Sequence, residues 1–409
     1  MLKRIAVKDI QLGMFICEFC GSWMEHPFWK TKFLLTDEKD LHAIKSSGIK
    51  ELWIDLALGA DFGQSVSGKS VEEVARETEA LLLKAHKAVA KDKISLEDEI
   101  QTAASLCAKA KEAVIEMFSD ARMGKAIEVE RARALVEEIS SSVLRQPHAL
   151  ISLARLKTAD EYTYMHSVAV CALMIALARQ LNLGEDSVRE AGFAGLLHDI
   201  GKVGIPAKVL NKPGKLTDGE FAIVKSHPEA GAKILIESYG VNPLVLDVCL
   251  HHHEKMDGTG YPHGLKGEAI SLFARMGAIC DVYDAITSNR PYKKGWAPAD
   301  SIRKMAEWSK GHFDEAVFQA FVKTVGIYPT GSLVRLESGR LAVVIEQDET
   351  SLLSPRVKVF FSAKTKMPII QETLELAKLV GKEKIIGRES PDDWGFKNLD
   401  MLWTGIGAV

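Results

Sequence analysis

The sequence has 409 residues, a formal net charge of −3, 47% hydrophobic residues and 26% charged residues. These values are typical of a globular protein with two or three domains, and the bulk charge gives no indication of binding to DNA, RNA or a membrane surface. The longest apolar run, Val168–Ala178, is too short to cross a bilayer, and the N-terminus lacks the long apolar segment of a signal peptide. We therefore expect a cytoplasmic protein without a membrane span.

Residues 1–65 have the pattern of a small α/β module. Strand-like patterns cover Ile5–Ile10 and Met14–Phe19, and a further strand is expected over Glu51–Leu56. Thr36, followed by two acidic residues, is expected to cap a helix between these strands, because a side-chain oxygen at the N-cap accepts a backbone N–H of the first turn.

Residues 66–145 form a predicted helical linker region, rich in alanine, glutamate and lysine and with helical periodicity. Ser70 and Glu73 have the spacing of a capping box at the start of a helix. Two interpretations remain open. The helices form a linker or hairpin that contacts a second copy in a homodimer, or they pack against their own domain.

Residues 146–328 have apolar patterns of helix length and hold most of the histidines, whereas residues 329–409 predict a short β-rich tail. The strand patterns of this tail cover Leu333–Leu336, Ala342–Glu346 and Val357–Phe361. The predicted fold is therefore mainly α. A helical catalytic domain is preceded by the small α/β module with its linker helices and followed by the β-rich tail.

A histidine and an aspartate stand side by side where an apolar run ends. His198 and Asp199 follow Ala191–Leu197 and precede Ile-Gly-Lys202. A histidine and a carboxylate at one helix end can bind one metal ion and bridge to a second. Lys202 would share their face if the helix continued, and its ammonium group could then hold a phosphate oxygen.

Further potential metal ligands follow this pair along the chain. Pro228 fits the first turn of a helix, which places His227 at a helix entrance. The three consecutive histidines His251–His253 cannot all face one way on a helix, but two neighbours can converge on a metal near its end. The glycines of residues 257–262 permit a tight loop, and Asp281 follows another apolar stretch.

Each of these residues alone has an ordinary structural explanation, as a core histidine, a helix-end ion pair or a helix cap. Together they form a donor set suited to two hard or borderline cations. Burying so many polar groups without a metal would cost several kcal/mol. The candidate metal ligands are His166, His198, Asp199, His227, His252, His253 and Asp281.

The joint motif resembles the HD-GYP family of bacterial phosphodiesterases, which belongs to the HD superfamily of metal-dependent phosphohydrolases. The resemblance rests on His198-Asp199-Ile-Gly-Lys202, His252-His253-Glu254 and Asp257-Gly-Thr-Gly-Tyr-Pro262, and it covers about residues 146–330. Residues 1 to about 130 are similar, more weakly, to an accessory domain often found ahead of such domains.

The resemblance implies a role for each candidate residue. One metal would be held by His166, His198, Asp199 and Asp281, and the second by His227, His252 and His253, with Asp199 as the bridge. The catalytic residues would be His198, Asp199 and Lys202. Substrate would be held by Lys202, Gly260, Tyr261, Pro262, Arg290 and Lys293. Three acidic residues are expected to orient ligands or water without binding the metals themselves: Glu254, Asp257 and Asp284. No role is matched by His251, His263 or His312.

The resemblance also implies the reaction and the cofactors. Two divalent metal ions, with iron or manganese expected and nickel or cobalt as alternatives, would assist water in opening cyclic di-GMP to the linear dinucleotide pGpG. A second cleavage to GMP is left open. Some members of the family hold a third metal with a glutamate, and here Tyr162 stands at that position, which favours two metals.

Two other functions are kept as alternatives. One is another HD-type phosphohydrolase that acts on a different nucleotide, and the other is a non-catalytic receptor for cyclic di-GMP. Gly260-Tyr261-Pro262, Arg290 and Lys293 favour the cyclic dinucleotide as substrate, and the complete ligand set argues against a pure receptor. The Gly-Tyr-Pro loop is also expected to offer a docking surface to a cyclase-type protein partner.

Overall fold

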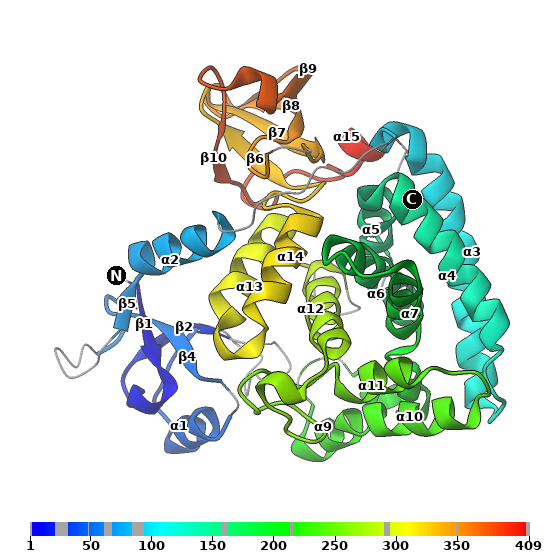
Figure 1. Cartoon of the computed structure of the whole chain (residues 1–409). Coiled ribbons are helices and arrows are strands. Elements are labelled where there is room, and N and C mark those ends of the chain that lie inside the picture. The colour runs from blue at the N-terminus through cyan, green and yellow to red at the C-terminus, as the bar shows by residue number, and fades with distance from the viewer. Residues whose placement is uncertain are drawn as a thin grey trace.

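A computed structural model of the chain describes residues 2–20, 32–47, 49–60, 68–83, 94–157, 162–212, 214, 216–289, 295–348 and 351–405. A helical body lies at the centre, and two β-sheets from the N-terminal and C-terminal parts of the chain lie beside it (Figure 1). The helices and the C-terminal sheet share one apolar core, whereas the N-terminal sheet has a smaller core of its own.

The N-terminal module is an antiparallel sheet with the strand order β3-β2-β4-β1-β5 and one helix. Its elements are β1 (Leu2–Ala6), β2 (Phe15–Cys20), β3 (Phe33–Leu34), α1 (Glu38–Lys45), β4 (Glu51–Asp55) and β5 (Gly68–Ser70). The buried side chains of Ile5, Ile16 and Leu52 meet Ile44 of α1 in the small core. The predicted small α/β module is confirmed.

The first strand is shorter than predicted. It ends at Ala6 rather than at Ile10, because Val7 begins a 3-10 turn that runs to Asp9. A hydrogen bond from Ile10 N to Val7 O, 3.2 Å long, closes this turn. The sequence pattern did not separate strand from turn, since apolar residues recur through both.

The N-cap of the following helix lies one residue later than predicted. Asp37, and not Thr36, caps α1, because its carboxylate accepts a hydrogen bond from Lys39 N at 2.8 Å. Both residue types are good N-caps, so the start of the helix at Glu38 decides between them.

The helix α2 (Val71–Leu83) begins with the predicted capping box. Ser70 N donates to Glu73 Oε2 (2.9 Å), and Glu73 N donates to Ser70 Oγ (3.2 Å). α2 packs against α13 (Pro298–His312) and α14 (Glu315–Val325). It therefore joins the N-terminal module to the helical body.

The next two helices, α3 (Leu96–Arg122) and α4 (Val129–Arg145), lie side by side along one edge of the helical body (Figure 1). Val114 and Phe118 of α3 and Leu135 of α4 are buried in the same core as the helices that follow. Of the two interpretations left open for this region, packing against its own domain is the one seen. The homodimer contact stays a prediction.

The helical body is arranged around α6 (Tyr162–Gln180), which is buried throughout Val168–Ala178, as expected of a helix that is apolar on every side. Its neighbours include α5 (Pro147–Arg155), α7 (Glu185–Leu197), α12 (Leu272–Thr287) and α14. The other helices of the body are α8 (Ala207–Leu210), α9 (Asp218–Lys225), α10 (His227–Glu237) and α11 (Pro243–His251). Among the residues described, no helix is long and apolar enough to span a membrane.

The C-terminal part is a second antiparallel sheet, with the strand order β10-β6-β7-β8-β9. Its elements are β6 (Leu333–Leu336), β7 (Arg340–Glu346), β8 (Arg356–Ser362), β9 (Met367–Glu375), β10 (Ile385–Arg388) and the short helix α15 (Met401–Thr404). Gly339 turns the chain between β6 and β7 with φ of 83°, which glycine adopts at little cost. The predicted fold class is confirmed, while the domain boundaries 1–65, 66–145, 146–328 and 329–409 stay predictions.

Candidate metal centre

The structure brings all the candidate ligands together inside the helical body. They are His166 in α6, His198 and Asp199 at the end of α7, His227 at the start of α10, His252 and His253 after α11, and Asp281 in α12. All are buried except His253, which is partly exposed. Two helices, α6 and α12, and the ends of three others therefore deliver polar side chains to one place in an otherwise apolar core.

The first group of donors consists of His166, His198, Asp199 and Asp281, whose ligand atoms all lie within 4.8 Å of one another. His166 Nε2 lies 3.0 Å from Asp281 Oδ1 and 3.3 Å from Asp199 Oδ2. His198 Nε2 also lies 3.3 Å from Asp199 Oδ2. Two imidazoles and two carboxylates thus converge on one point.

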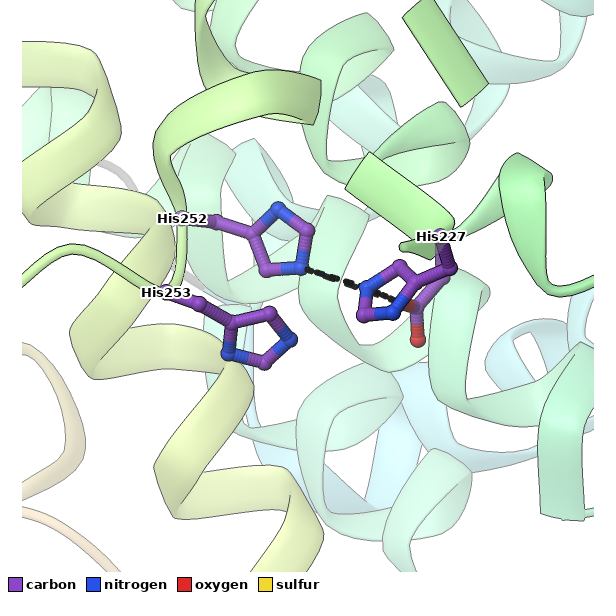
Figure 2. Close-up of side chains that lie close together, drawn as sticks. His227, His252 and His253 are labelled. Atoms are coloured by element: carbon purple, nitrogen blue, oxygen red, sulfur yellow. Dashed lines mark hydrogen bonds and ion pairs between the residues drawn. The ribbon is translucent and has the colours of Figure 1, made fainter. Parts of the chain in front are cut away.

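The second group consists of Asp199, His227, His252 and His253. His227 Nε2 lies 3.2 Å from Asp199 Oδ1 and 3.3 Å from His252 Nε2. Figure 2 shows the rings of His227 and His252 facing each other through these nitrogens, with His253 beside them. Asp199 therefore turns Oδ2 to the first group and Oδ1 to the second, which is the arrangement of a bridging carboxylate.

The histidine rings are oriented by the backbone. Nδ1 of His198, His227 and His252 lies within 2.7 to 3.0 Å of a carbonyl oxygen, to which it donates its proton. This fixes the tautomer, so that the lone pair of Nε2 faces the donor groups. His198 Nε2, Asp199 Oδ1 and His253 Nε2 are buried and have no hydrogen-bond partner among the described residues. Such a donor set fits divalent cations with nitrogen and oxygen ligands.

The local charges favour the protonation states that metal ligands need. Burial lowers the pKa of His252 to about 3, so its ring is neutral. Burial alone would raise the pKa of Asp199, but the charge of Lys202 and hydrogen bonds keep it well below its usual range. Neutral imidazoles and ionised carboxylates are the forms that coordinate metals.

His166 differs from the other rings because three carboxylates surround it. Burial opposes its protonation, but hydrogen bonds to Asp199, Asp281 and Asp284 raise the pKa of His166 to about 10. Without a metal, the ring therefore supplies the positive charge among these acids. A divalent cation between His166 Nε2 and the two ligand aspartates would replace that proton as the counter-charge.

The buried Lys157 is connected to the His166 ring through Asp284, and it was not singled out from the sequence. Lys157 Nζ donates to both oxygens of Asp284 (2.7 and 2.6 Å), and Asp284 Oδ2 lies 2.6 Å from His166 Nδ1. Asp284 thus contacts a candidate ligand, and the supporting role expected for it stays a prediction. Lys157 lies in no motif and precedes α6 in sequence, so no local pattern marked it.

The helix that carries the His-Asp pair does not continue to Lys202, which was the condition stated for a shared face. α7 ends at Leu197, and Ile200–Gly204 form a 3-10 turn that brings the ammonium group of Lys202 into contact with the Asp199 carboxylate. A side chain at Gly201 would collide with the backbone of α10, since its Cβ would lie 2.0 Å from His227 O. Close packing of the turn on α10 therefore requires the glycine.

The Gly-Tyr-Pro loop covers the second group of donors. The ring of Tyr261 stacks on the ring of His253, with centroids 4.7 Å apart and planes inclined by 25°. The next residue is Pro262, and the Tyr261–Pro262 peptide is cis. A Cβ at Gly260 would lie 2.4 Å from Glu254 Cα, so glycine is needed for close packing. The loop thus forms a wall beside His253.

Glu254 and Asp257 hold this loop through its backbone. The Glu254 carboxylate accepts hydrogen bonds from His263 N (2.8 Å) and Leu265 N (3.0 Å). Asp257 Oδ1 accepts from Thr259 N (2.9 Å) and Thr259 Oγ1 (2.6 Å). Both acids therefore shape the loop, and the role expected for them from the sequence, in supporting ligands or water, stays a prediction.

Asp257 also connects the loop to the N-terminal module. Its second oxygen forms an ion pair with Lys50, which precedes β4. Next to this pair, the module and the helical body border a cavity of about 670 Å³, whose lining includes Arg4, Lys255 and Glu307. The loop of the candidate site is therefore in direct contact with the module.

The remaining predicted residues fall into two classes. Arg290 and Lys293, and the side chain of Tyr162, lie outside the described residues. His251 and His263 lie outside both donor groups, as expected, with His251 Nε2 3.0 Å from His263 Nδ1 and His251 Nδ1 2.7 Å from Asp247 Oδ1.

Comparison with known proteins assigns the chain to a family. Residues 142–317 match the HD domain, and residues 2–132 match a domain of unknown function (DUF3391). The chain is 59% identical over 408 residues to the cyclic di-GMP phosphodiesterase PA4108 of Pseudomonas aeruginosa, which covers 99% of this chain and 96% of that protein. This chain belongs to the HD-domain phosphodiesterase family. The segment matched to the HD domain contains every candidate ligand.

Other proteins similar to this HD-domain phosphodiesterase match it over a smaller part or more distantly. It is 35% identical over 189 residues to the 3'3'-cGAMP-specific phosphodiesterase 1 of Vibrio cholerae, which covers 46% of this chain and 42% of that protein. A solved structure, Bd1817, an HDG"Y"P protein from Bdellovibrio bacteriovorus, has 18% sequence identity and a TM-score of 0.47, and covers 78% of this chain and 98% of that chain. The full-length relative is the one that shows the family.

Proposed function

We propose that this HD-domain phosphodiesterase hydrolyses cyclic di-GMP to the linear dinucleotide pGpG, using two divalent metal ions held between His166 and Asp281. The observation that carries the proposal is the position of Asp199, whose two oxygens face two separate groups of histidines. The identity with a cyclic di-GMP phosphodiesterase along the full chain supports the substrate. A second cleavage, to GMP, is a separate question for product analysis.

The two donor groups would each hold one metal. The first would be bound by His166, His198, Asp199 and Asp281, and the second by Asp199, His227, His252 and His253. When bound, such cations polarise the phosphate and lower the pKa of water, so that a nucleophile forms near neutral pH. Iron or manganese suits this mixed nitrogen and oxygen set, and nickel and cobalt are the alternatives.

Lys202 is proposed to act on the reacting phosphate. Its ammonium group contacts Asp199, and its side chain is 19% exposed, so one side of it remains accessible to a ligand. A fixed cation at this place stabilises the negative charge that develops on the phosphate oxygens in the transition state. Lys202 thus lies beside the reacting atoms without being a metal ligand.

The Gly-Tyr-Pro loop and the segment after α12 are proposed to hold the rest of the substrate. Tyr261 covers His253, and Lys225 lies 5.4 Å above the centroid of the Tyr261 ring. This wall, with Gly260 and Pro262, would border one guanine. Arg290 and Lys293 remain the proposed contacts of the phosphate that is not cut, because guanidinium and ammonium groups suit phosphate oxygens.

A second substrate is worth testing because of one comparison. A partial relative acts on 3'3'-cGAMP, as its name states. Cyclic di-GMP and 3'3'-cGAMP differ in one base, so the same metals and cations could serve both. The cytoplasmic location, the cyclase-type partner on the Gly-Tyr-Pro loop and the homodimer also stay predictions.

The test is a comparison of substrates on protein loaded with manganese or iron. Cyclic di-GMP, 3'3'-cGAMP and a mononucleotide would be incubated separately, and the products separated by chromatography. We expect pGpG from cyclic di-GMP at the highest kcat/KM. Faster hydrolysis of 3'3'-cGAMP would assign the second substrate, and hydrolysis of the mononucleotide alone would favour a general phosphohydrolase. Tight binding without any product would indicate a receptor.

A further inference from the structure

We propose that Lys157 is a positioning residue of the metal centre, which holds Asp284 so that Asp284 can hold His166. The inference rests on the proposed function, because it takes His166 to be a metal ligand. Lys157 contacts Asp284, and Asp284 contacts His166, so Lys157 would act on the metal centre through Asp284.

The contacts form a chain of three side chains from three segments. Lys157 follows α5, His166 lies in α6 and Asp284 lies in α12. Lys157 Nζ lies 2.7 Å from Asp284 Oδ1 and 2.6 Å from Oδ2, and Oδ2 lies 2.6 Å from His166 Nδ1. A carboxylate has no proton to give, so Nδ1 is the protonated nitrogen and Nε2 faces the first donor group.

The Asp284 carboxylate is held by other groups in addition to the His166 ring. The ammonium group binds both oxygens of Asp284, and Ser288 Oγ donates to Oδ1 at 3.2 Å. The carboxylate plane is therefore fixed by two groups in addition to His166. A histidine ligand whose second nitrogen is held by a fixed acceptor keeps its ring orientation and binds metal more tightly.

The burial of Lys157 indicates that the ion pair has a specific purpose. Its side chain is 0% exposed, and among the described residues it is the only lysine that is buried. A buried ammonium group is costly unless it is paired, and a buried ion pair often stabilises a fold no more than apolar side chains of the same size. Packing alone would be served as well by an apolar residue.

Lys157 also balances the charge around His166. Asp199, Asp281 and Asp284 all lie within 3.3 Å of this ring. Lys157 neutralises Asp284, the one acid of the three that is not a candidate ligand. The two remaining carboxylates are then available to divalent cations, and Asp284 stays ionised as an acceptor for His166 Nδ1.

The alternative is that Lys157 and Asp284 only fasten α12 to the end of α5. The two explanations differ for a variant in which both charges are removed together. Lys157→Met combined with Asp284→Asn replaces a charged pair by a neutral one of similar size, which a purely structural pair tolerates. The single variant Lys157→Met leaves an unpaired buried carboxylate, so loss of its fold would not decide the question.

The test measures metal affinity and thermal stability in four full-length proteins. They are the wild type, Lys157→Met, the double variant, and Arg145→Met as a matched control. Arg145 also binds a buried carboxylate, that of Glu99, at 2.6 and 2.8 Å, but it has no contact with the donor groups. Manganese affinity would be measured by competition with a chelator, and the melting temperature by circular dichroism.

We expect the double variant to melt near the wild-type temperature but to bind the manganese ion of the first donor group about 10- to 100-fold less tightly, the usual effect of losing a group that orients a metal ligand. Arg145→Met should lose stability and keep its metal affinity. Wild-type metal affinity in the double variant would overturn the proposed role of Lys157 but not the proposed function. Absence of metal binding by the wild type would overturn both this role and the proposed function.

Discussion

Asp199 places Oδ1 3.2 Å from Nε2 of His227, while its other oxygen faces a different histidine pair. One carboxylate therefore joins two groups of ligands that come from different helices. The helix α7 ends at Leu197, so the pair lies where the chain leaves this helix.

The first prediction concerns the neighbouring residues His252 and His251. His252→Ala should lose one metal and reduce hydrolysis of cyclic di-GMP at least 1,000-fold, on the order of magnitude lost with a catalytic group. His251→Ala should keep both metals and a kcat close to wild type, because His251 pairs with Asp247 and His263 outside the donor groups. Metal analysis and steady-state kinetics check both, and equal losses in the two variants would contradict the site.

The second prediction extends this to the His-Asp pair. His198→Ala should remove the first metal, and Asp199→Ala should reduce the occupancy of both, because only Asp199 belongs to both donor groups. Hydrolysis should be abolished in each. If Asp199→Ala kept normal turnover with an intact fold, the bridging role would be wrong.

The third prediction separates the two phosphates of the substrate. Lys202→Ala should lower kcat about 10²- to 10³-fold with its metals retained, as when one transition-state donor is removed. Arg290→Ala and Lys293→Ala should mainly raise KM, because they are proposed to hold the phosphate that is not cut. The opposite pattern in steady-state kinetics would mean that the two phosphates are reversed.

The fourth prediction concerns the stack of Tyr261 on His253. Tyr261→Phe should keep the stack, and it removes a buried hydroxyl that has no hydrogen-bond partner in the described residues, so stability should not fall. Tyr261→Ala should remove the ring that supports His253 and lower the affinity for the second metal roughly tenfold. Metal titrations of both variants test this, and equal affinities would show that the stack does not support His253.

The fifth prediction concerns the link to the N-terminal module. Lys50→Ala should change the free energy of unfolding by less than about 1 kcal/mol, because the Lys50 side chain is 54% exposed and exposed ion pairs contribute little. Asp257→Ala should cost more, about 1–2 kcal/mol, since it also removes the two hydrogen bonds that Thr259 N and Oγ1 donate to its carboxylate. Urea unfolding measures both, and a larger effect for Lys50→Ala would show that the ion pair holds the loop.

Several residues of the two buried donor groups could be found from the sequence because they lie in short, specific motifs, while their role as metal ligands stays a prediction. His198-Asp199 and His252-His253 are adjacent in the chain, and both pairs lie at helix ends in the structure. The fold class followed from composition and periodicity along long segments. Whether the helices α3 and α4 pack on their own domain could not be decided, since an apolar helix face does not identify its partner.

The sequence did not show contacts between distant residues. Lys157 and Asp284 are far apart in the chain, and an isolated lysine before α6 has no feature that separates it from a surface lysine. The carboxylate of Glu254 binds the backbone of its own loop, a contact that the sequence did not indicate. The contacts of these side chains depend on their orientation in the folded protein, which tertiary packing determines.

The most direct test of the account is metal and product analysis of the wild-type protein, purified without oxygen. The account predicts two divalent metals per chain and conversion of cyclic di-GMP to pGpG, with activity lost on chelation and restored by manganese or iron. Three fully occupied metal sites in anomalous scattering would contradict the two-metal count. Hydrolysis of cyclic di-GMP that persists at the same rate in metal-free protein would contradict the central claim.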